Sequence, residues 1–513
     1  MQLPGTVQQP PNQEMSRSST PPPSILFILT DQQACHTLSC YGGPDTVSRT
    51  PAIDRLAEDG ILFERAYTPC ALCTPARASL LTGLYPHNHG VLFNTGAYSR
   101  FTEAQCGAGL RTYPERLKAA GYRLGYSGKW HAGIARTAAD AGFEGFSLPD
   151  YGAVRQDAGY REYLRGLGME SPRRHIEFVA EGGPVEQSGG NLSGWIEGTV
   201  ESSPCHYVAN RAMEQLDRLA EGEAPWFLAV NFWEPHAPYL PTEDFKDRYA
   251  GAPIPEWPNF ADTLEGKPRW HRIMRDAIFP GARDAEWEIW SEVIRRYYAQ
   301  AAMVDHQVER LLAHLRTLGK YEDCLIVFAS DHGESVGIHG GAFDKGGQAY
   351  EELYRIPMIA KLPGSERAGE RREALVSLMD LGPTFSDYAG TGMEGTDGQS
   401  LRPVLEGGDG AGRAFLLSED HGHRVPFGQR ILWGESGKYV WNLSDIDEFY
   451  DLERDPAELL NRIEDPDYRE VVAHYRKEML YQVTANRDPL GPQVTQMLSG
   501  FPRKEKWATD EAD

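Results

Sequence analysis

One short segment combines a thiol with a fixed positive charge at the expected start of a helix. It reads Cys73-Thr74-Pro75-Ala76-Arg77 and continues as Ala78-Ser79-Leu80-Leu81-Thr82-Gly83. Proline suits the first helical turn, where its missing N–H leaves no hydrogen bond unmade. Arg77 would lie one helical turn from the sulfur of Cys73, and a guanidinium there favours an anion. The segment predicts a helix over residues 76–84 that presents a thiol and a cation to an anionic group.

Two polar dipeptides, each directly after an apolar run, have the composition of a divalent cation site. They are Asp31-Gln32 and Asp331-His332. Two carboxylates and an amide oxygen favour Ca²⁺, Mg²⁺ or Mn²⁺, and the imidazole adds a slight preference for Mn²⁺. Taken singly, an Asp-His pair after a strand is more typical of a helix cap or a turn. The two pairs together favour the metal interpretation.

Basic side chains also follow expected strands. Lys129 and His131 follow one strand, His236 follows another, and Lys345 lies fourteen residues after Asp331. Each has a structural alternative, because a lone lysine is usually solvated and a lone histidine often serves a turn. Together with the arginine near the thiol, the two lysines and a cation would create a local positive field. Such a field predicts a small anionic ligand.

These residues need a scaffold that brings distant segments together, and the hydrophobic pattern supplies one. Apolar, β-branched runs predict strands at 25–29, 61–67, 123–127, 226–232, 325–330 and 357–362. Longer periodic segments predict helices at 53–58, 76–84, 113–120, 206–220 and 287–318. This alternation indicates an α/β fold with a mostly parallel sheet sandwiched by helices. Ligands in such sheets bind at the carboxyl ends of the strands.

The rest of the chain predicts a smaller C-terminal α+β domain. A helix is expected at 373–389, followed by strands at 415–418, 430–433 and 439–442 and a helix at 468–485. We therefore expect a disordered arm at 1–23, a catalytic domain at 24–390 and a C-terminal domain at 391–513. Two weakly periodic stretches, 140–204 and 253–285, are expected to be excursions that cover a pocket.

Composition excludes several classes of function. The 513 residues include 41% hydrophobic residues, enough for a large core, and carry a formal net charge of −23. The acidic balance argues against a nucleic-acid partner, and the seven cysteines do not suggest a disulfide framework. The apolar run near the N-terminus is too short to cross a membrane, and no signal peptide is recognisable. We expect a cytoplasmic protein without a membrane partner; no pattern indicates its oligomeric state.

The motifs resemble those of type I sulfatases, members of the alkaline phosphatase superfamily. The first segment matches C-x-P-x-R-x-x-x-x-T-G, residues 128–131 match G-K-W-H, and Pro235-His236 matches a strand-end element. The Gln32 and His332 variant is most similar to the phosphonate monoester hydrolase and choline sulfatase branch. Asn94 and His339 lie near motif positions as possible pocket residues. The resemblance extends from about Ser24 to Asn461 and implies the sulfatase fold.

The resemblance also implies a chemistry. A formylglycine-generating enzyme would oxidise Cys73 to formylglycine, whose hydrate attacks the ester and later collapses the covalent product. One divalent cation, Ca²⁺ before Mn²⁺ or Mg²⁺, would be held by Asp31, Gln32, Cys73, Asp331 and His332. The implied catalytic residues are Cys73, Arg77, His131 as base and His236 as leaving-group acid. The implied substrate-binding residues are Lys129, Lys345 and His236.

The leading hypothesis is a hydrolase of sulfate monoesters. Its candidate substrates are a sulfated sugar, an aryl or alkyl sulfate and choline sulfate. Hydrolysis of phosphonate monoesters or phosphodiesters is the alternative, because the same nucleophile and ion would serve a tetrahedral phosphorus centre. Two further alternatives are a catalytically silent binder of sulfated ligands and a thiol hydrolase that uses unmodified Cys73 with a histidine. The thiol hydrolase leaves the two aspartate pairs unexplained.

Overall fold

A computed structural model of the chain describes residues 21–498, with gaps at 43–45, 96–109, 134–136, 149–151, 170, 189, 366, 409–411, 424–425 and 436. Most of the expected N-terminal arm at 1–23 therefore lies outside the described residues. Among the described residues, no helix is both long and apolar enough to traverse a bilayer.

The centre of the molecule is an eight-stranded sheet in the order β11-β2-β10-β9-β1-β8-β4-β5. The strands are β1 Ser24–Asp31, β2 Ile61–Phe63, β4 Arg123–Lys129, β5 Glu144–Leu148, β8 Trp226–Pro235, β9 Cys324–Ser330, β10 Met358–Lys361 and β11 Glu370–Arg372. Strand β1 runs parallel to β8 and β9, and β4 runs parallel to β8 and β5. Only β10, among the described strands of this sheet, runs antiparallel to its neighbours. The predicted mostly parallel sheet is confirmed.

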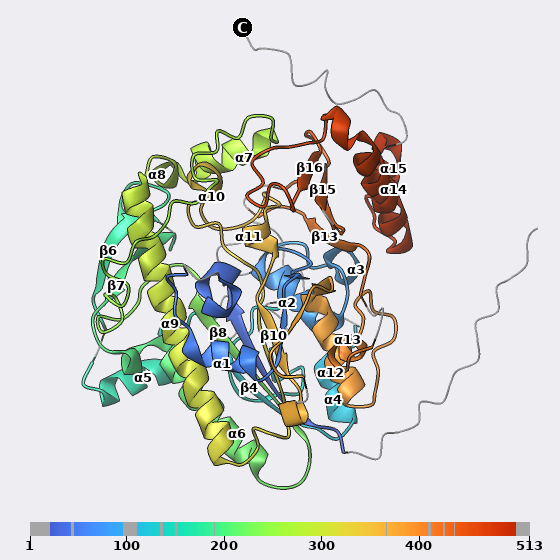
Figure 1. The fold of residues 1–513 in the computed structure, drawn as a ribbon. Helices are drawn as coiled ribbons and strands as arrows, with labels where there is room; N and C mark the ends of the chain where they lie inside the picture. The colour runs from blue at the N-terminus through green and yellow to red at the C-terminus, as the bar shows by residue number, and fades with distance from the viewer. Residues whose placement is uncertain are drawn as a thin grey trace, which may run out of the picture.

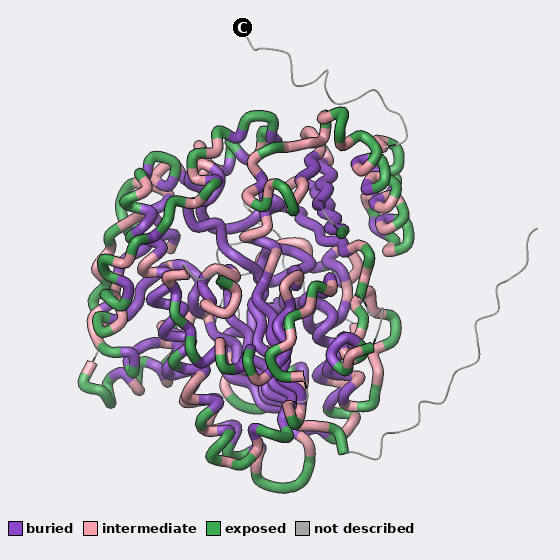
Figure 2. Tube along the Cα trace, viewed as in Figure 1, coloured by how far each residue is buried: buried purple, intermediate pink, exposed green. Residues whose placement is uncertain are grey.

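Helices cover both faces of this sheet, and alternation along β1 shows why. Side chains of a strand point alternately to opposite faces, so Leu26 and Ile28 pack under α6 Pro204–Ala220 and α9 Trp287–Thr317. Ile25, Phe27 and Leu29 face α2 Cys73–Thr82, α4 Tyr113–Ala119 and α12 Leu381–Tyr388. Figures 1 and 2 show the strands as a buried core between these two helical layers.

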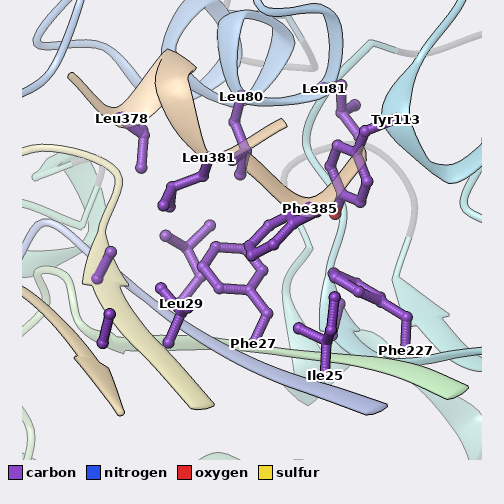
Figure 3. Close-up of a cluster of buried hydrophobic side chains, with 14 of the residues drawn as sticks. Ile25, Phe27, Leu29, Leu80, Leu81, Tyr113, Phe227, Leu378, Leu381 and Phe385 are labelled. Atoms are coloured by element: carbon purple, nitrogen blue, oxygen red, sulfur yellow. The ribbon is translucent and has the colours of Figure 1, made fainter. Parts of the chain in front are cut away.

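An aromatic cluster joins the second helical layer to the sheet. Phe385 of α12 lies 5.3 Å from Phe27, 5.1 Å from Phe227 and 5.4 Å from Tyr113, measured between ring centroids. Figure 3 shows these rings pointing toward one another between the helix and strands β1 and β8. Large buried rings contribute much of the core's burial free energy, so this cluster fixes the helical layer that includes α2.

The predicted smaller C-terminal α+β domain is confirmed, and it carries an antiparallel sheet of four strands, one more than expected. They are β13 Leu416–Asp420, β14 Gln429–Trp433, β15 Gly437–Asn442 and β16 Glu448–Asp451. Two helices cover it, α14 Arg469–Ala485 and α15 Gly491–Leu498. Figure 1 shows these orange and red elements beside the carboxyl end of the main sheet.

Two expected elements are wrong in their bounds. The expected strand at 61–67 is divided into β2 and β3 Ala66–Tyr67, and β3 pairs instead with β12 Val376–Ser377. The expected helix at 373–389 begins at Leu381, after β12 and a 3₁₀ turn. Ser377 and Asp380 form a capping box there, and such a box marks a helix start rather than a helix interior.

The two expected excursions contain regular structure. Residues 140–204 include α5 Ala158–Gly166 and the hairpin β6 Arg174–Val179 with β7 Leu192–Ile196, and they also supply β5 of the main sheet. Residues 253–285 include α7 Arg269–Ile273, a π-helix at Met274–Ile278 and α8 Pro280–Arg283. The sequence analysis missed β5 because this short edge strand is half exposed and lacks an apolar run.

Replacing Phe385 by alanine should destabilise the fold, because the cavity left among three aromatic rings cannot close fully. We expect a loss of about 3–5 kcal/mol in the free energy of unfolding, measured by urea denaturation. Tyr481→Ala is the matched control, since Tyr481 is 64% exposed. Equal denaturation midpoints for the two variants would show that the cluster does not hold the helical layer.

Candidate active site

The thiol lies at the start of a buried helix. Helix α2 begins at Cys73 itself, after the extended Leu72, and ends at Gly83, whose φ of 68° is left-handed. The prediction of 76–84 therefore began one turn late. All ten residues of α2 are buried, and Cys73 has no exposed surface. Burial and the charge of Asp31 raise the pKa of the Cys73 thiol to about 12.

Asp31 at the end of β1 is the centre of the charged site. Its Oδ2 lies 2.8 Å from an Arg77 guanidinium nitrogen and 2.6 Å from Lys129 Nζ. The Nε of Arg77 also lies 2.9 Å from Oδ2 of Asp331. Burial alone would raise the pKa of Asp31. The charges of Lys129 and Arg77 outweigh this effect and hold the pKa well below its usual value. Asp31 is therefore an anion held between two cations.

Four predicted residues meet in the geometry of a metal site. Ligand atoms of Asp31, Cys73, Asp331 and His332 all lie within 4.8 Å of one another. The Cys73 sulfur lies 3.2 Å from His332 Nε2 and 3.6 Å from Asp31 Oδ1. His332 Nδ1 lies 2.9 Å from the carbonyl oxygen of Gly333, so the proton belongs on Nδ1 and Nε2 is the unprotonated ligand atom. This donor set fits one divalent cation.

Gln32 directly follows Asp31, and its backbone and side chain are both hydrogen-bonded at the site. Its backbone N–H donates to Asp331 Oδ1 at 3.1 Å. Its side-chain amide nitrogen donates to Glu334 and, at 3.1 Å, to Asp344, while its amide oxygen accepts from Lys345 Nζ. The two carboxylates fix the amide in this orientation. In this structure the Gln32 side chain is therefore hydrogen-bonded to Glu334, Asp344 and Lys345.

Lys345 and His236 form a pair on one side of the site. Lys345 Nζ lies 2.9 Å from His236 Nε2 and 3.2 Å from Asp344 Oδ1. His236 Nδ1 donates to the carbonyl oxygen of Ala237 at 2.5 Å, so Nε2 accepts the hydrogen bond that Lys345 donates. Burial and the nearby Lys345 charge lower the pKa of His236 well below its usual value. The imidazole is therefore neutral, and its unprotonated Nε2 faces the Lys345 ammonium.

His131 is connected to the thiol helix through an intervening segment. Its Nε2 donates to Thr95 O at 3.0 Å, and Thr95 N donates to the Thr74 hydroxyl at 3.2 Å. Asn94 accepts from Thr74 N at 3.0 Å, so this possible pocket residue instead holds the backbone next to Cys73. Burial and Lys129 lower the pKa of His131, which keeps its ring neutral.

Sequence reasoning missed three residues of the site. Glu334 and Asp344 hold Gln32, and the Trp233 ring centroid lies 4.5 Å from Lys129 Nζ and 5.2 Å from the His236 ring. Their proximity to the motifs was the available signal, since each is within three residues of a predicted site residue.

The other possible pocket residue, His339, lies in a separate buried network. It stacks on Tyr350 with ring centroids 3.4 Å apart and contacts Asp262 and Lys267.

Comparisons with known proteins agree with this geometry. The family model for sulfatases matches residues 23–391, and the model for the C-terminal part of N-sulphoglucosamine sulphohydrolase matches residues 337–485. An uncharacterised sulfatase, YidJ of Escherichia coli (strain K12), is 30% identical over 472 residues, covering 91% of this chain and 88% of its own length. A choline-sulfatase of Rhizobium meliloti (strain 1021) is 29% identical, with coverage of 87% and 84%.

A solved phosphonate monoester hydrolase of Agrobacterium radiobacter superimposes with a TM-score of 0.75 at 26% identity, covering 90% of this chain and 96% of that chain. The likeness extends through both domains. Because the sulfatase family model spans residues 23–391, well over half of the sequence, the chain belongs to the sulfatase family and is an enzyme that hydrolyses sulfate esters.

Proposed function

We propose that the chain hydrolyses sulfate monoesters on a formylglycine made from Cys73, beside one divalent cation held by Asp31, Gln32, Asp331, His332 and residue 73. The position of the Cys73 side chain carries this proposal. Its sulfur lies within 3.6 Å of the Asp31 carboxylate and the His332 imidazole. Charged groups are unfavourable in a buried place unless they are paired. A chemistry confined to an unmodified thiol would give no role to the two aspartates.

The hydrated aldehyde would supply a hydroxyl nucleophile, and the cation would lower its pKa and neutralise charge on the ester. Arg77 holds Asp31 and Asp331 in one orientation, because its guanidinium contacts both carboxylates. We assign Lys129 and Lys345 to the anionic ester oxygens. Both ammonium groups are buried, and fixed cations stabilise developing negative charge best where water is excluded.

Proton transfer is assigned to two histidines. His236 would protonate the leaving group through Nε2, after this nitrogen has taken up the proton that the hydroxyl nucleophile loses on attack. Lys345 Nζ, 2.9 Å from Nε2, stays charged for the ester oxygens. His131 would act as the base that opens the covalent ester, through the nitrogen that does not donate to Thr95. Both rings are neutral in the resting structure, so each can accept a proton before it passes one on.

We propose a small sulfate ester as the substrate: a sulfated sugar, an aryl or alkyl sulfate, or choline sulfate. The similarity to a choline-sulfatase and to the C-terminal part of N-sulphoglucosamine sulphohydrolase supports this set. Maturation requires a formylglycine-generating enzyme as a partner. Ca²⁺ is the proposed ion because the site offers two carboxylates, and Mn²⁺ and Mg²⁺ are the alternatives.

A second candidate is hydrolysis of phosphonate monoesters or phosphodiesters. The similarity to a solved phosphonate monoester hydrolase favours it. The same nucleophile, cation and lysines would serve a tetrahedral phosphorus centre, so the geometry of the charged groups does not separate the two reactions.

A matched pair of chromogenic esters tests the proposed function. On protein coexpressed with a formylglycine-generating enzyme, kcat/KM for an aryl sulfate should exceed that for the corresponding aryl phosphonate monoester. Cys73→Ala should lower sulfate turnover by about 10³-fold or more, because the nucleophile is lost. Cys70→Ala, a buried thiol three residues away, is the control and should retain activity. The reverse preference would establish the second candidate, and an active Cys73→Ala protein would exclude the nucleophile.

Metal binding should depend on Asp331. Asp331→Asn removes one anionic ligand, so we expect the cation affinity to fall by about 10–100-fold and turnover to fall with it. Titration calorimetry on chelator-treated protein measures the affinity, and excess cation should restore part of the activity. Asp305→Asn, a buried carboxylate that caps α1 Pro51–Glu58, is the control. Turnover that survives exhaustive chelation would remove the cation from the mechanism.

Leaving groups should reveal the role of His236. His236→Ala should slow esters with poor leaving groups far more than those with good ones, because only poor leaving groups need protonation in the transition state. The measurement is the slope of log kcat/KM against leaving-group pKa, which should become steeper in the variant. A uniform loss across the series would assign His236 to substrate binding alone.

A further inference from the structure

The substrate lysine Lys345 lies on a buried segment without regular structure. Residues 342–350 connect α10 Ile338–Gly341 to α11 Glu351–Tyr354, and every residue in them is buried. A buried backbone that forms neither helix nor sheet must find hydrogen-bond partners elsewhere in the molecule. The conformation of this segment, and with it the position of the Lys345 ammonium, depends on those partners.

Side chains of the C-terminal domain form hydrogen bonds to the backbone at every second residue from 345 to 351. His423 Nδ1 lies 3.3 Å from Lys345 O, and Gly347 N donates to Asp420 Oδ2 at 3.2 Å. Further along, Lys438 Nζ donates to Ala349 O, and Glu351 N donates to Glu458 Oε2 at 2.7 Å. Figure 1 shows α11 adjacent to strands of that domain. Four side chains from one domain thus hold the backbone that bears a catalytic-domain lysine.

Three of these side chains are ionisable groups that are fully or almost fully buried. Asp420 and Lys438 have no exposed surface, and Glu458 is 1% exposed. Lys438 pairs with Glu458, while Asp420 accepts further hydrogen bonds from Tyr354 OH at 3.2 Å and Gly422 N at 2.7 Å. A buried polar side chain with fixed hydrogen-bond partners has little freedom to move. The C-terminal domain therefore restricts the position of the segment's backbone through these side chains.

Two glycines allow the close approach. A Cβ atom on Gly346 would lie 2.6 Å from His423 Cβ, and one on Gly347 would lie 1.9 Å from Trp270 Nε1. Both residues also have left-handed φ values, 88° and 80°. The segment is therefore shaped to fit its neighbours directly after Lys345, where a side chain would push it away.

We propose that the C-terminal domain positions Lys345, and that Asp420 is the principal positioning residue. Gln32 and Asp344 hold the ammonium itself, whereas Asp420 holds the backbone two residues further on. Loss of Asp420 should let the segment relax and weaken the anion site without touching the cation site. This inference rests on the proposed function, because it takes Lys345 to be a ligand of the ester oxygens.

A double-mutant cycle distinguishes positioning from a merely structural role. Asp420→Ala and Lys345→Met are made singly and together, and the affinity for inorganic sulfate is measured by calorimetry on cation-loaded protein. Asp420→Ala should weaken sulfate binding about tenfold when Lys345 is present and less than about twofold when it is absent. The KM for an aryl sulfate should rise in parallel, while the cation affinity stays unchanged.

One control variant and two replacement variants accompany the double-mutant cycle. Asp447→Asn removes a carboxylate in the same domain that accepts from Tyr439 and Asn442, and it should leave sulfate affinity unchanged. If Asp420→Ala does not fold, as judged by thermal melting, the milder Asp420→Asn and Lys438→Met replace it in the cycle.

Equal losses in both Lys345 backgrounds, or no loss in either, would overturn the positioning role. Absence of sulfate ester turnover by the matured wild-type protein would instead overturn the proposed function. The sulfate-affinity cycle does not depend on turnover, so the two failures are distinguishable.

Discussion

The site depends on one buried carboxylate, that of Asp31, held between Arg77 and Lys129. Burying the Asp31 charge without a partner would cost several kcal/mol, so the fold must bring all three side chains into contact. They come from β1, α2 and β4, and only a parallel sheet with α2 packed on one face brings their ends to the same place. The same pairing keeps Asp31 ionised, which is the state a divalent cation requires. The pairing that satisfies this buried charge is therefore also the one that keeps the proposed cation ligand ionised.

The sequence predicted the central strands because strands buried on both faces must be apolar almost throughout. Leu26 and Phe27 face opposite helical layers, so neither position tolerates a polar side chain, and β1, β8 and β9 all share this pattern. The edge strand β5 was not predicted, because it is half exposed and therefore lacks the apolar run of a buried strand. The segment 376–380 was assigned to a helix on local pattern, whereas pairing with β3 and a capping box decide its structure. Pairing partners so distant in sequence leave no local signal.

For the site, the sequence predicted which residues gather but not how each side chain is directed. Asp31, Cys73, Asp331 and His332 do meet, because strand ends and a helix start share one edge of the sheet. The orientation of Gln32 could not be predicted, since Glu334 and Asp344 on other segments fix its amide. The hydrogen bond from Gly347 N to Asp420 links residues from two domains, and the spacing of residues in the sequence does not predict such a contact.

The central claim is that residue 73 acts as formylglycine rather than as a thiol. Mass analysis of the tryptic peptide 66–77, fragmented to separate Cys73 from Cys70, measures the converted fraction in a sample whose active sites are titrated in parallel. The account predicts that residue 73 loses mass and that the converted fraction equals the fraction of protein that turns over sulfate ester. Full turnover by protein in which Cys73 is entirely an intact thiol would contradict it.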